Sequence, residues 1–216
     1  MKFFSNTQTA LKICGVKTLE DAEQLVSLSV DAVGFNFWPE SKRYLAPSNA
    51  QWMKSLVGKI LRVGVFVNEA GDLPYDLVRA GMIDVVQLHG DESPEIALKF
   101  SRAGIPVIKA LGIKSAEDLD EAGKFETDAV LLDAHAPKVF GGTGETFDWN
   151  LALQFKQKFP NRPMVLAGGI TPENAVSAVN EVNPAAIDVA SGAEISPGVK
   201  DFNKVKKLLE ACGKDR

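Results

Sequence analysis

The sequence predicts a single (β/α)8 barrel, in which eight parallel strands close into an inner ring and helices cover the outside. Short apolar runs rich in β-branched residues alternate with helical patterns eight times in 216 residues, roughly one unit per 27 residues. No G-x-G-x-x-G motif opens the first helix, so the main alternative, an open doubly wound sheet, is less well supported.

The eight apolar runs define the strands, and each ends near Gly, Asn, His or Asp. The predicted strands cover residues 10–14, 31–37, 60–67, 83–89, 106–112, 128–133, 163–169 and 185–191.

Capping signals mark several helix starts. In two places a hydroxyl residue is followed three residues later by an aspartate, a weak form of the capping box. In two others a hydroxyl residue precedes a proline, which favours the first helical position. These pairs are Thr18 with Asp21, Ser115 with Asp118, Ser93 with Pro94, and Thr171 with Pro172.

Composition indicates one globular domain, residues 1–216, with 45% hydrophobic and 24% charged residues. The net charge is −4 and basic residues form no run, so we expect neither nucleic-acid nor membrane partners. The apolar runs are strand-sized and the first residues resemble no signal peptide, which favours a cytoplasmic location. We expect a monomer rather than a homodimer.

Cysteine and histidine usage predicts no metal site. Cys14 and Cys212 lie near opposite ends of the chain, and the only histidines are His89 and His135. No metal-ligand spacing is present, and cytosolic thiols stay reduced, although a disulfide is possible in principle. The sequence assigns no role to His135 or Cys212.

Along the predicted strands one side is consistently apolar, and the other carries polar residues. In a barrel we expect the polar side to face the interior, with residues at the carboxyl ends of strands reaching the active face. For any one of these residues the alternative is a hydrogen-bonded polar group of the core. That alternative fits all nine together less well, because buried charges are costly unless paired. The set is Lys12, Cys14, Asn36, Arg62, Gln87, His89, Lys109, Asp133 and Asp188.

Glycine-rich loops after the last three strands predict a phosphate site. "FGGTGETFDW", "LAGGITPENA" and "VASGAEISPG" follow strands six, seven and eight. Backbone N–H groups can approach an anion closely at glycines, and loops seven and eight often bind phosphate in such barrels. Ordinary turns would also explain any single loop.

Three side chains at strand ends suggest proton transfer on an anionic substrate. Cys14 ends strand one and Asp133 ends strand six, so a thiolate base and a carboxylic acid would face each other across the mouth. Lys12 could favour the thiolate, and His89 leaves a covalent role for Cys14 open. Arg43, in "FWPESKRYL", could bind a carboxylate or be a solvated surface charge.

Nearly the whole sequence resembles the phosphoribosylanthranilate isomerase family of tryptophan biosynthesis. "KICG", "GFNFWPESKRY", "VGVFVN", "VQLHGDE", "LLDA", "GGTGETFDW", "LAGGITPENA", "DVASG" and "SPGVKD" occur in the order typical of that family. Two positions depart from the family pattern: Ala190 stands where serine is expected, and Ala193 where a bulkier aliphatic residue is usual.

The resemblance implies an Amadori rearrangement of N-(5-phosphoribosyl)anthranilate that needs no cofactor. It implies that Asp133 protonates the furanose ring oxygen, that Cys14 removes the C2 proton, and that Arg43 holds the anthranilate carboxylate. His89 and Asp188 would line the mouth. The phosphate would be bound by the backbone of Gly142, Thr143, Gly144, Gly168, Gly169, Ser191 and Gly192.

Three other functions remain open on the sequence alone. A histidine-pathway isomerase barrel performs the same chemistry, but with an aspartate at the end of strand one and a repeated phosphate loop, neither of which is found here. A non-catalytic sensor of phosphorylated metabolites is compatible with the fold. A redox role for Cys14 and Cys212 would need two facing thiols, which their spacing does not indicate.

Overall fold

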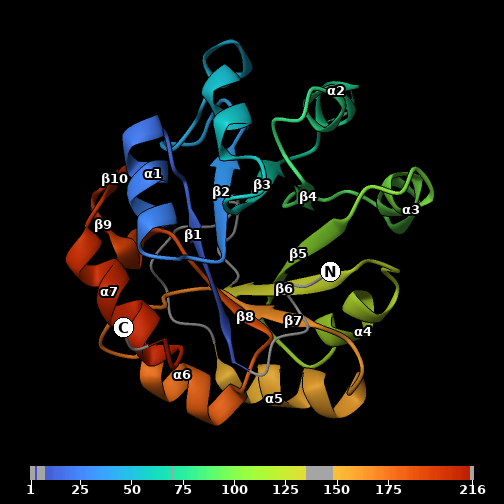
Figure 1. Ribbon diagram of the computed structural model, residues 1–216. Helices are drawn as coiled ribbons and strands as arrows, with labels where there is room; N and C mark the ends of the chain where they lie inside the picture. Colours follow the sequence, from blue (N-terminus) through green and yellow to red (C-terminus); the bar gives the residue numbers. More distant parts are fainter. Residues whose placement is uncertain (1–2, 4–7, 70, 135–147, 215–216) are drawn as a thin grey trace.

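Eight parallel strands close into a barrel in the computed structural model, which describes residues 3, 8–69, 71–134 and 148–214. The strands are β1 (Ala10–Cys14), β2 (Ala32–Asn36), β3 (Leu61–Phe66), β4 (Val85–Leu88), β5 (Val107–Ile113), β6 (Ala129–Ala134), β7 (Met164–Leu166) and β8 (Ala186–Val189). Each pairs with the next, and β8 pairs with β1, which confirms the predicted barrel (Figure 1).

Helices surround this ring. The α-helices are α1 (Leu19–Ser27), α2 (Leu73–Arg79), α3 (Pro94–Arg102), α4 (Asp118–Gly123), α5 (Trp149–Lys158), α6 (Ala175–Val182) and α7 (Phe202–Ala211). Between β2 and β3 the chain forms short 3-10 helices, η2 (Pro47–Asn49) and η3 (Gln51–Leu56). After β8 come a 3-10 turn, η4 (Ser191–Ala193), and a hairpin of β9 (Glu194–Ser196) and β10 (Val199–Lys200).

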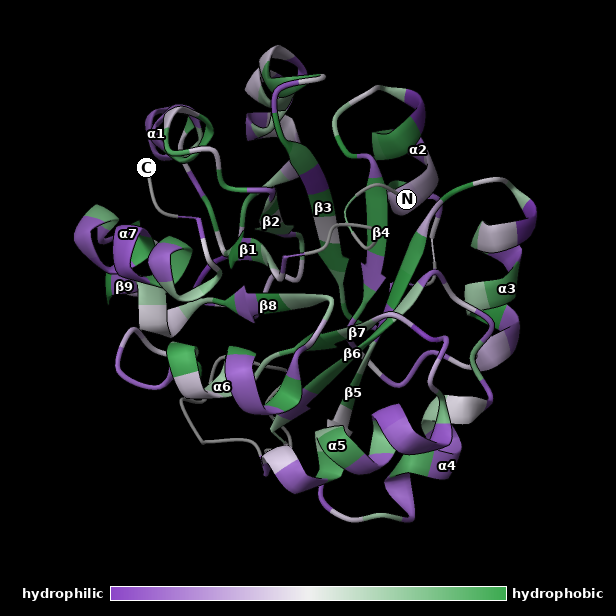
Figure 2. Ribbon diagram, turned by 60° about the horizontal axis from the view of Figure 1, so that its bottom comes forward, coloured by the Kyte–Doolittle hydropathy of each residue, from purple (hydrophilic) through white to green (hydrophobic). Residues whose placement is uncertain are grey.

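Apolar side chains form two cores. Figure 2 shows largely apolar strands and helices with mixed polar and apolar surfaces. The larger core lies between strands and helices, where Leu11, Ile13 and Phe155 are fully buried. The smaller core fills the barrel with small residues such as Ala10, Ala32 and Val63. Within the described residues, no helix is long and apolar enough to cross a membrane.

Two of the four predicted helix starts are confirmed. The Thr18 hydroxyl accepts a hydrogen bond from the N–H of Asp21 at 3.2 Å, and α1 begins at Leu19. Pro94 is the first residue of α3, as the Ser93-Pro94 pair predicted, although the Ser93 hydroxyl makes no capping hydrogen bond.

The other two predictions were wrong about the capping group. The α6 helix begins at Ala175 rather than Pro172, because the Asn174 side chain accepts the N–H of Thr171 and forms a turn before the helix. Near α4, the Asp118 carboxylate accepts the N–H of Ser115 at 3.0 Å, whereas the Ser115 hydroxyl does not cap the helix.

Candidate active site

The carboxyl ends of the strands bring together the chemically active side chains that the sequence predicted. Cys14 is the last residue of β1, His89 directly follows β4, and Asp133 is the penultimate residue of β6. Because the strands are parallel, their carboxyl ends meet at one mouth of the barrel, and Cys14 and Asp133 both lie there. Around the ring, β7 and β8 lie between β6 and β1. Arg43 reaches this mouth from the loop after β2.

A buried ion pair lies inside the barrel, one inward-facing position below Cys14. Parallel pairing of β1 with β8 aligns Lys12 with Asp188, and their Nζ and Oδ1 atoms are 2.8 Å apart. Lys12 is fully buried. Burial alone would lower the pKa of Lys12, but the charge of Asp188 and the adjacent Cys14 outweigh burial and raise it. Lys12 therefore remains an ammonium ion and cannot be the base of the site.

Burial and the neighbouring charges act in opposite directions on the pKa of Cys14. Burial raises the pKa of the Cys14 thiol above its ordinary value, and the charge of Asp188 acts in the same direction. The positive charges of Lys12, Lys200 and Arg43 lower the pKa but only partly offset burial. The thiol of the free protein is therefore mostly protonated at neutral pH, with three cations placed to stabilise the thiolate once it forms.

Asp133 belongs to a short chain of polar groups. Its Oδ1 accepts the N–H of Ala134 at 2.8 Å, and its Oδ2 lies 3.3 Å from Nε2 of His89. On the far side of the imidazole, Nδ1 lies 2.9 Å from Nε2 of Gln87 in the barrel interior. His89 thus holds the Asp133 carboxyl in place at the mouth.

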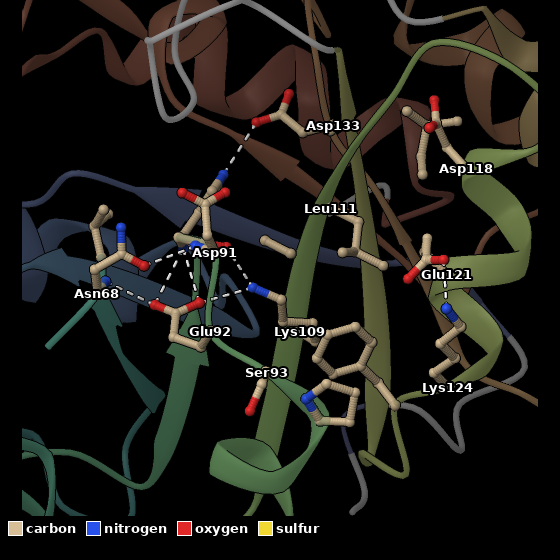
Figure 3. Close-up of a pocket in the computed structure, with 18 of the residues that line it drawn as sticks. Asn68, Asp91, Glu92, Ser93, Lys109, Leu111, Asp118, Glu121, Lys124 and Asp133 are labelled. Atoms are coloured by element: carbon tan, nitrogen blue, oxygen red, sulfur yellow. Dashed lines mark hydrogen bonds and ion pairs between the residues drawn. The ribbon is translucent and has the colours of Figure 1, made fainter. Parts of the chain in front are cut away.

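A cavity of about 1200 Å³ opens beside Asp133 and His89 and extends along β5 toward α4. Figure 3 shows Asp133 at one part of this cavity and the Lys109–Glu92 pair, with Asn68, at another. The cavity is large enough for a drug-sized ligand.

Two of the three predicted phosphate loops, those after β7 and β8, lie at the same end of the barrel. Gly168 and Gly169 follow β7 after one intervening residue and have φ of +81° and +66°, a left-handed backbone that favours glycine. A Cβ on Gly192 would lie 2.0 Å from the Ile170 carbonyl oxygen, so loops seven and eight touch through a position that only glycine fits. The N–H groups of Gly168 and Gly169 donate to no backbone oxygen in the described part of the chain.

The structure describes some of the remaining residues that the sequence singled out, and others fall outside the described ranges. Ser191 is the first residue of the 3-10 turn η4, which follows β8. Gly142, Thr143 and Gly144, and also His135, lie outside the described residues. Cys14 and Cys212 are both free thiols.

Two polar residues were assigned to the wrong side of their strands. The inward residue of β3 is Val63, so Arg62 points to the helix side, where Asp84 binds it through two nitrogens. In β5 the inward residues are Ile108 and Ala110, and Lys109 instead pairs with Glu92 at 2.7 Å. Arg62 and Lys109 are therefore each buried beside a carboxylate, since a buried charge without a partner costs much free energy.

Glu194 and Lys200 are further members of the site that the sequence patterns did not single out. Both lie in the hairpin after β8, outside the repeating strand and helix pattern. Lys200 Nζ donates to the carbonyl oxygen of Cys14 at 2.5 Å and to Glu194 at 2.7 Å. Among the described residues, no three His, Cys, Asp or Glu side chains are grouped as metal ligands.

Gly34 has no side chain, and this leaves room for the thiol of Cys14. It pairs with Cys14 in the neighbouring strand, and a Cβ at Gly34 would lie 2.8 Å from Sγ of Cys14 and 3.0 Å from Nζ of Lys12. Gly34→Ala should therefore displace both groups and lower kcat/KM by about 10- to 100-fold, the usual effect of misplacing a reacting group.

Gly64→Ala is the matched control, because the atoms nearest to a Cβ at Gly64 belong to Ile83 and Phe66, at 2.7 and 2.9 Å, and not to a residue of the proposed site. This substitution should lower stability by about 1–3 kcal/mol through overpacking and leave kcat/KM nearly unchanged. Steady-state kinetics and thermal unfolding of both variants check this expectation. Equal activity losses would mean that the effect is general strain in the barrel.

The fold and the site define a class. This is a (β/α)8-barrel enzyme with a thiol, a carboxyl group and an imidazole at the carboxyl ends of its strands and glycine-rich loops after the last two of them. Residues 11–211 match the family model of N-(5'-phosphoribosyl)anthranilate (PRA) isomerase, and the chain belongs to that family.

Relatives agree with this assignment. The N-(5'-phosphoribosyl)anthranilate isomerase of Thermotoga maritima is 42% identical over 201 residues, 93% of this chain and 96% of the relative. A crystal structure of monomers generated from the dimeric Thermotoga maritima enzyme has a TM-score of 0.83 at 38% identity, covering 95% of this chain and 98% of that one. A structure of the isomerase with reduced 1-(o-carboxyphenylamino)-1-deoxyribulose 5-phosphate has a TM-score of 0.82 at 39% identity, with the same coverage.

Proposed function

We propose that this protein catalyses the Amadori rearrangement of N-(5-phosphoribosyl)anthranilate to 1-(2-carboxyphenylamino)-1-deoxyribulose 5-phosphate in tryptophan biosynthesis. Family membership supports the reaction. The observation that carries the assignment of roles is the presence of Cys14, Asp133 and Arg43 at one barrel mouth, where they can act as base, acid and carboxylate ligand.

The reaction begins at Asp133, which donates a proton to the furanose ring oxygen. The C1–O bond breaks and leaves a Schiff base between C1 and the anthranilate nitrogen. The Cys14 thiolate then removes the proton from C2, and the electrons of that C–H bond form an enolamine. Protonation at C1 and loss of the C2 hydroxyl proton give the ketone. The redox change stays within the substrate, so no cofactor is required.

Charged groups near Cys14 suit the second proton transfer. The ammonium group of Lys12 lies next to the thiol, and Arg43 and Lys200 add positive charge. A negative charge formed on sulfur in this poorly solvated site is stabilised by these cations. Asp188 keeps Lys12 in position through their ion pair.

The two ends of the substrate have separate binding groups. In the proposal the phosphate accepts hydrogen bonds from the N–H groups of Gly168, Gly169 and Gly192, with Ser191 and the loop residues Gly142, Thr143 and Gly144 completing the site. The anthranilate carboxylate binds the guanidinium of Arg43. His89 and Asp188 flank the ribose.

The fluorescence decay of freshly prepared N-(5-phosphoribosyl)anthranilate tests the function. The wild-type protein should accelerate this decay with saturable kinetics and yield the carboxyphenylamino ketose. Binding of a product analogue without any turnover would contradict the proposal and favour a sensor. Absence of both binding and turnover would rule out this substrate altogether.

The proposed enzyme acts alone on a small phosphorylated molecule, as a cytoplasmic monomer without nucleic-acid or membrane partners. Light scattering with size-exclusion chromatography tests the oligomeric state. The mass of one chain is expected, and the mass of two chains would make this protein resemble the dimeric relative instead.

A further inference from the structure

Glu194 is a buried carboxylate that accepts hydrogen bonds from four donor groups. It is the first residue of β9 and 5% exposed. Its oxygens accept hydrogen bonds from Nε and Nη2 of Arg43, at 2.9 and 2.7 Å, and from Nζ of Lys200, at 2.7 Å. The N–H of Gly198 adds a fourth donor at 3.1 Å.

Opposite charges stabilise one another in the ion cluster of Glu194, Arg43 and Lys200. Burial would raise the pKa of Glu194, but the hydrogen bond from Arg43 and the charge of Lys200 outweigh it and lower the pKa. Burial lowers the pKa of Lys200, while Glu194 acts against this shift. One carboxylate thus stands between two cations, and the surplus positive charge favours an anion at the barrel mouth.

The path of the Arg43 side chain fixes where its guanidinium lies. A Cβ on Gly15 would lie 2.3 Å from Cδ of Arg43, so the arginine passes directly over the residue that follows Cys14. Glu194 then holds the Nε and Nη2 edge of the guanidinium. The remaining nitrogen, Nη1, donates to no group among the described residues and is available to a ligand.

We propose that Glu194 is a positioning residue that selects substrates with a ring carboxylate. By binding one edge of Arg43, Glu194 presents the other edge beside Cys14. This inference rests on the proposed function, because it gives a structural basis for recognition of the aromatic half of the substrate. Without Glu194 the guanidinium can rotate and loses the orientation needed for a two-point contact with a carboxylate.

A pair of substrates separates positioning from general structural support. Ribose 5-phosphate condenses with anthranilate or with aniline, which gives two N-glycosides that differ only in the ring carboxylate. Wild type should prefer the carboxylated compound in kcat/KM. Glu194→Gln should lose at least about tenfold on this compound, mainly through KM, and change by less than about twofold on the aniline compound. Glu194→Asp, which keeps the charge, should recover part of the preference.

The control breaks a similar arginine–carboxylate pair elsewhere. Asp84→Asn removes the two-point contact with Arg62 near the amino ends of β3 and β4. Any effect of Asp84→Asn should fall equally on both substrates. Circular dichroism and thermal unfolding identify a variant that does not fold, in which case Glu194→Asp provides the comparison.

The outcomes distinguish the two proposals. Equal losses on both substrates with Glu194→Gln would make Glu194 merely structural and overturn the inference. Failure of wild type to convert the carboxylated compound would overturn the proposed function instead. In that case, calorimetry can still measure how tightly wild type and Glu194→Gln bind the reduced ketose product, with and without its ring carboxylate. If both proteins prefer the carboxylated ligand to the same extent, the proposed role of Glu194 is overturned.

Discussion

Asp133→Asn should lower kcat by about 10² to 10⁴-fold, the usual contribution of a general acid. Asparagine has the shape of aspartate and can still face His89 and the N–H of Ala134, but its amide cannot supply a proton to the ring oxygen. Because ring opening comes first in the reaction, all later steps stop with it. KM should change little, since the proposed contacts to the carboxylate and the phosphate remain. Stopped-flow and steady-state fluorescence measure both constants.

Asp128→Asn is the matched control for this prediction. Asp128 directly precedes β6, at the opposite end of the barrel, and its carboxylate accepts the N–H of Val107 at 2.9 Å. The variant can lose some stability, but its kcat should stay within about twofold of wild type. A retained kcat in Asp133→Asn would mean that another group, or water, protonates the ring oxygen.

Much of the barrel was predictable because its signals are local. Strand positions follow from short apolar runs, and parallel order follows from the helices between them. The prediction that Cys14 and Asp133 share one mouth needed only strand ends and barrel closure. Loops seven and eight were predictable for the same reason, since glycine is required where backbones approach closely, as at Gly192.

The two wrong helix starts came from local side chains, Asn174 and Asp118, that bind the backbone in place of the predicted hydroxyl groups. The errors at the site occurred where long-range pairing decides. A lysine or arginine within a strand indicates that a charge is present but not which side it faces. Arg62 points toward the helices, where it forms an ion pair with Asp84. Lys109 also points to that side, where it forms an ion pair with Glu92. Glu194 was missed for a related reason: its main partner, Arg43, lies 151 residues earlier in the chain. Neither residue alone indicates the buried contact.

Cys14→Ser should lower kcat by at least as much as Asp133→Asn. A serine hydroxyl fits the space beside Gly34, but it holds its proton far more tightly than a thiol, so no base is present to remove the C2 proton. Cys212→Ser is the matched control. Burial raises the pKa of Cys212 to about 12, and this thiol lies at the end of α7, so its loss should leave the kinetics unchanged.

The pH profile gives an independent test of the same base. Because burial raises the pKa of Cys14, the thiolate is a minor form at neutral pH, and its fraction increases about tenfold per pH unit below that pKa. The rate at which iodoacetamide alkylates Cys14, measured in Cys212→Ser, should therefore rise with pH between about pH 7 and pH 9, because the thiolate is the nucleophile. A flat alkylation profile over this range would mean that the thiolate already exists in the free enzyme. Survival of activity in Cys14→Ser would instead mean that another group is the base, since both a preformed and a newly formed thiolate predict its loss.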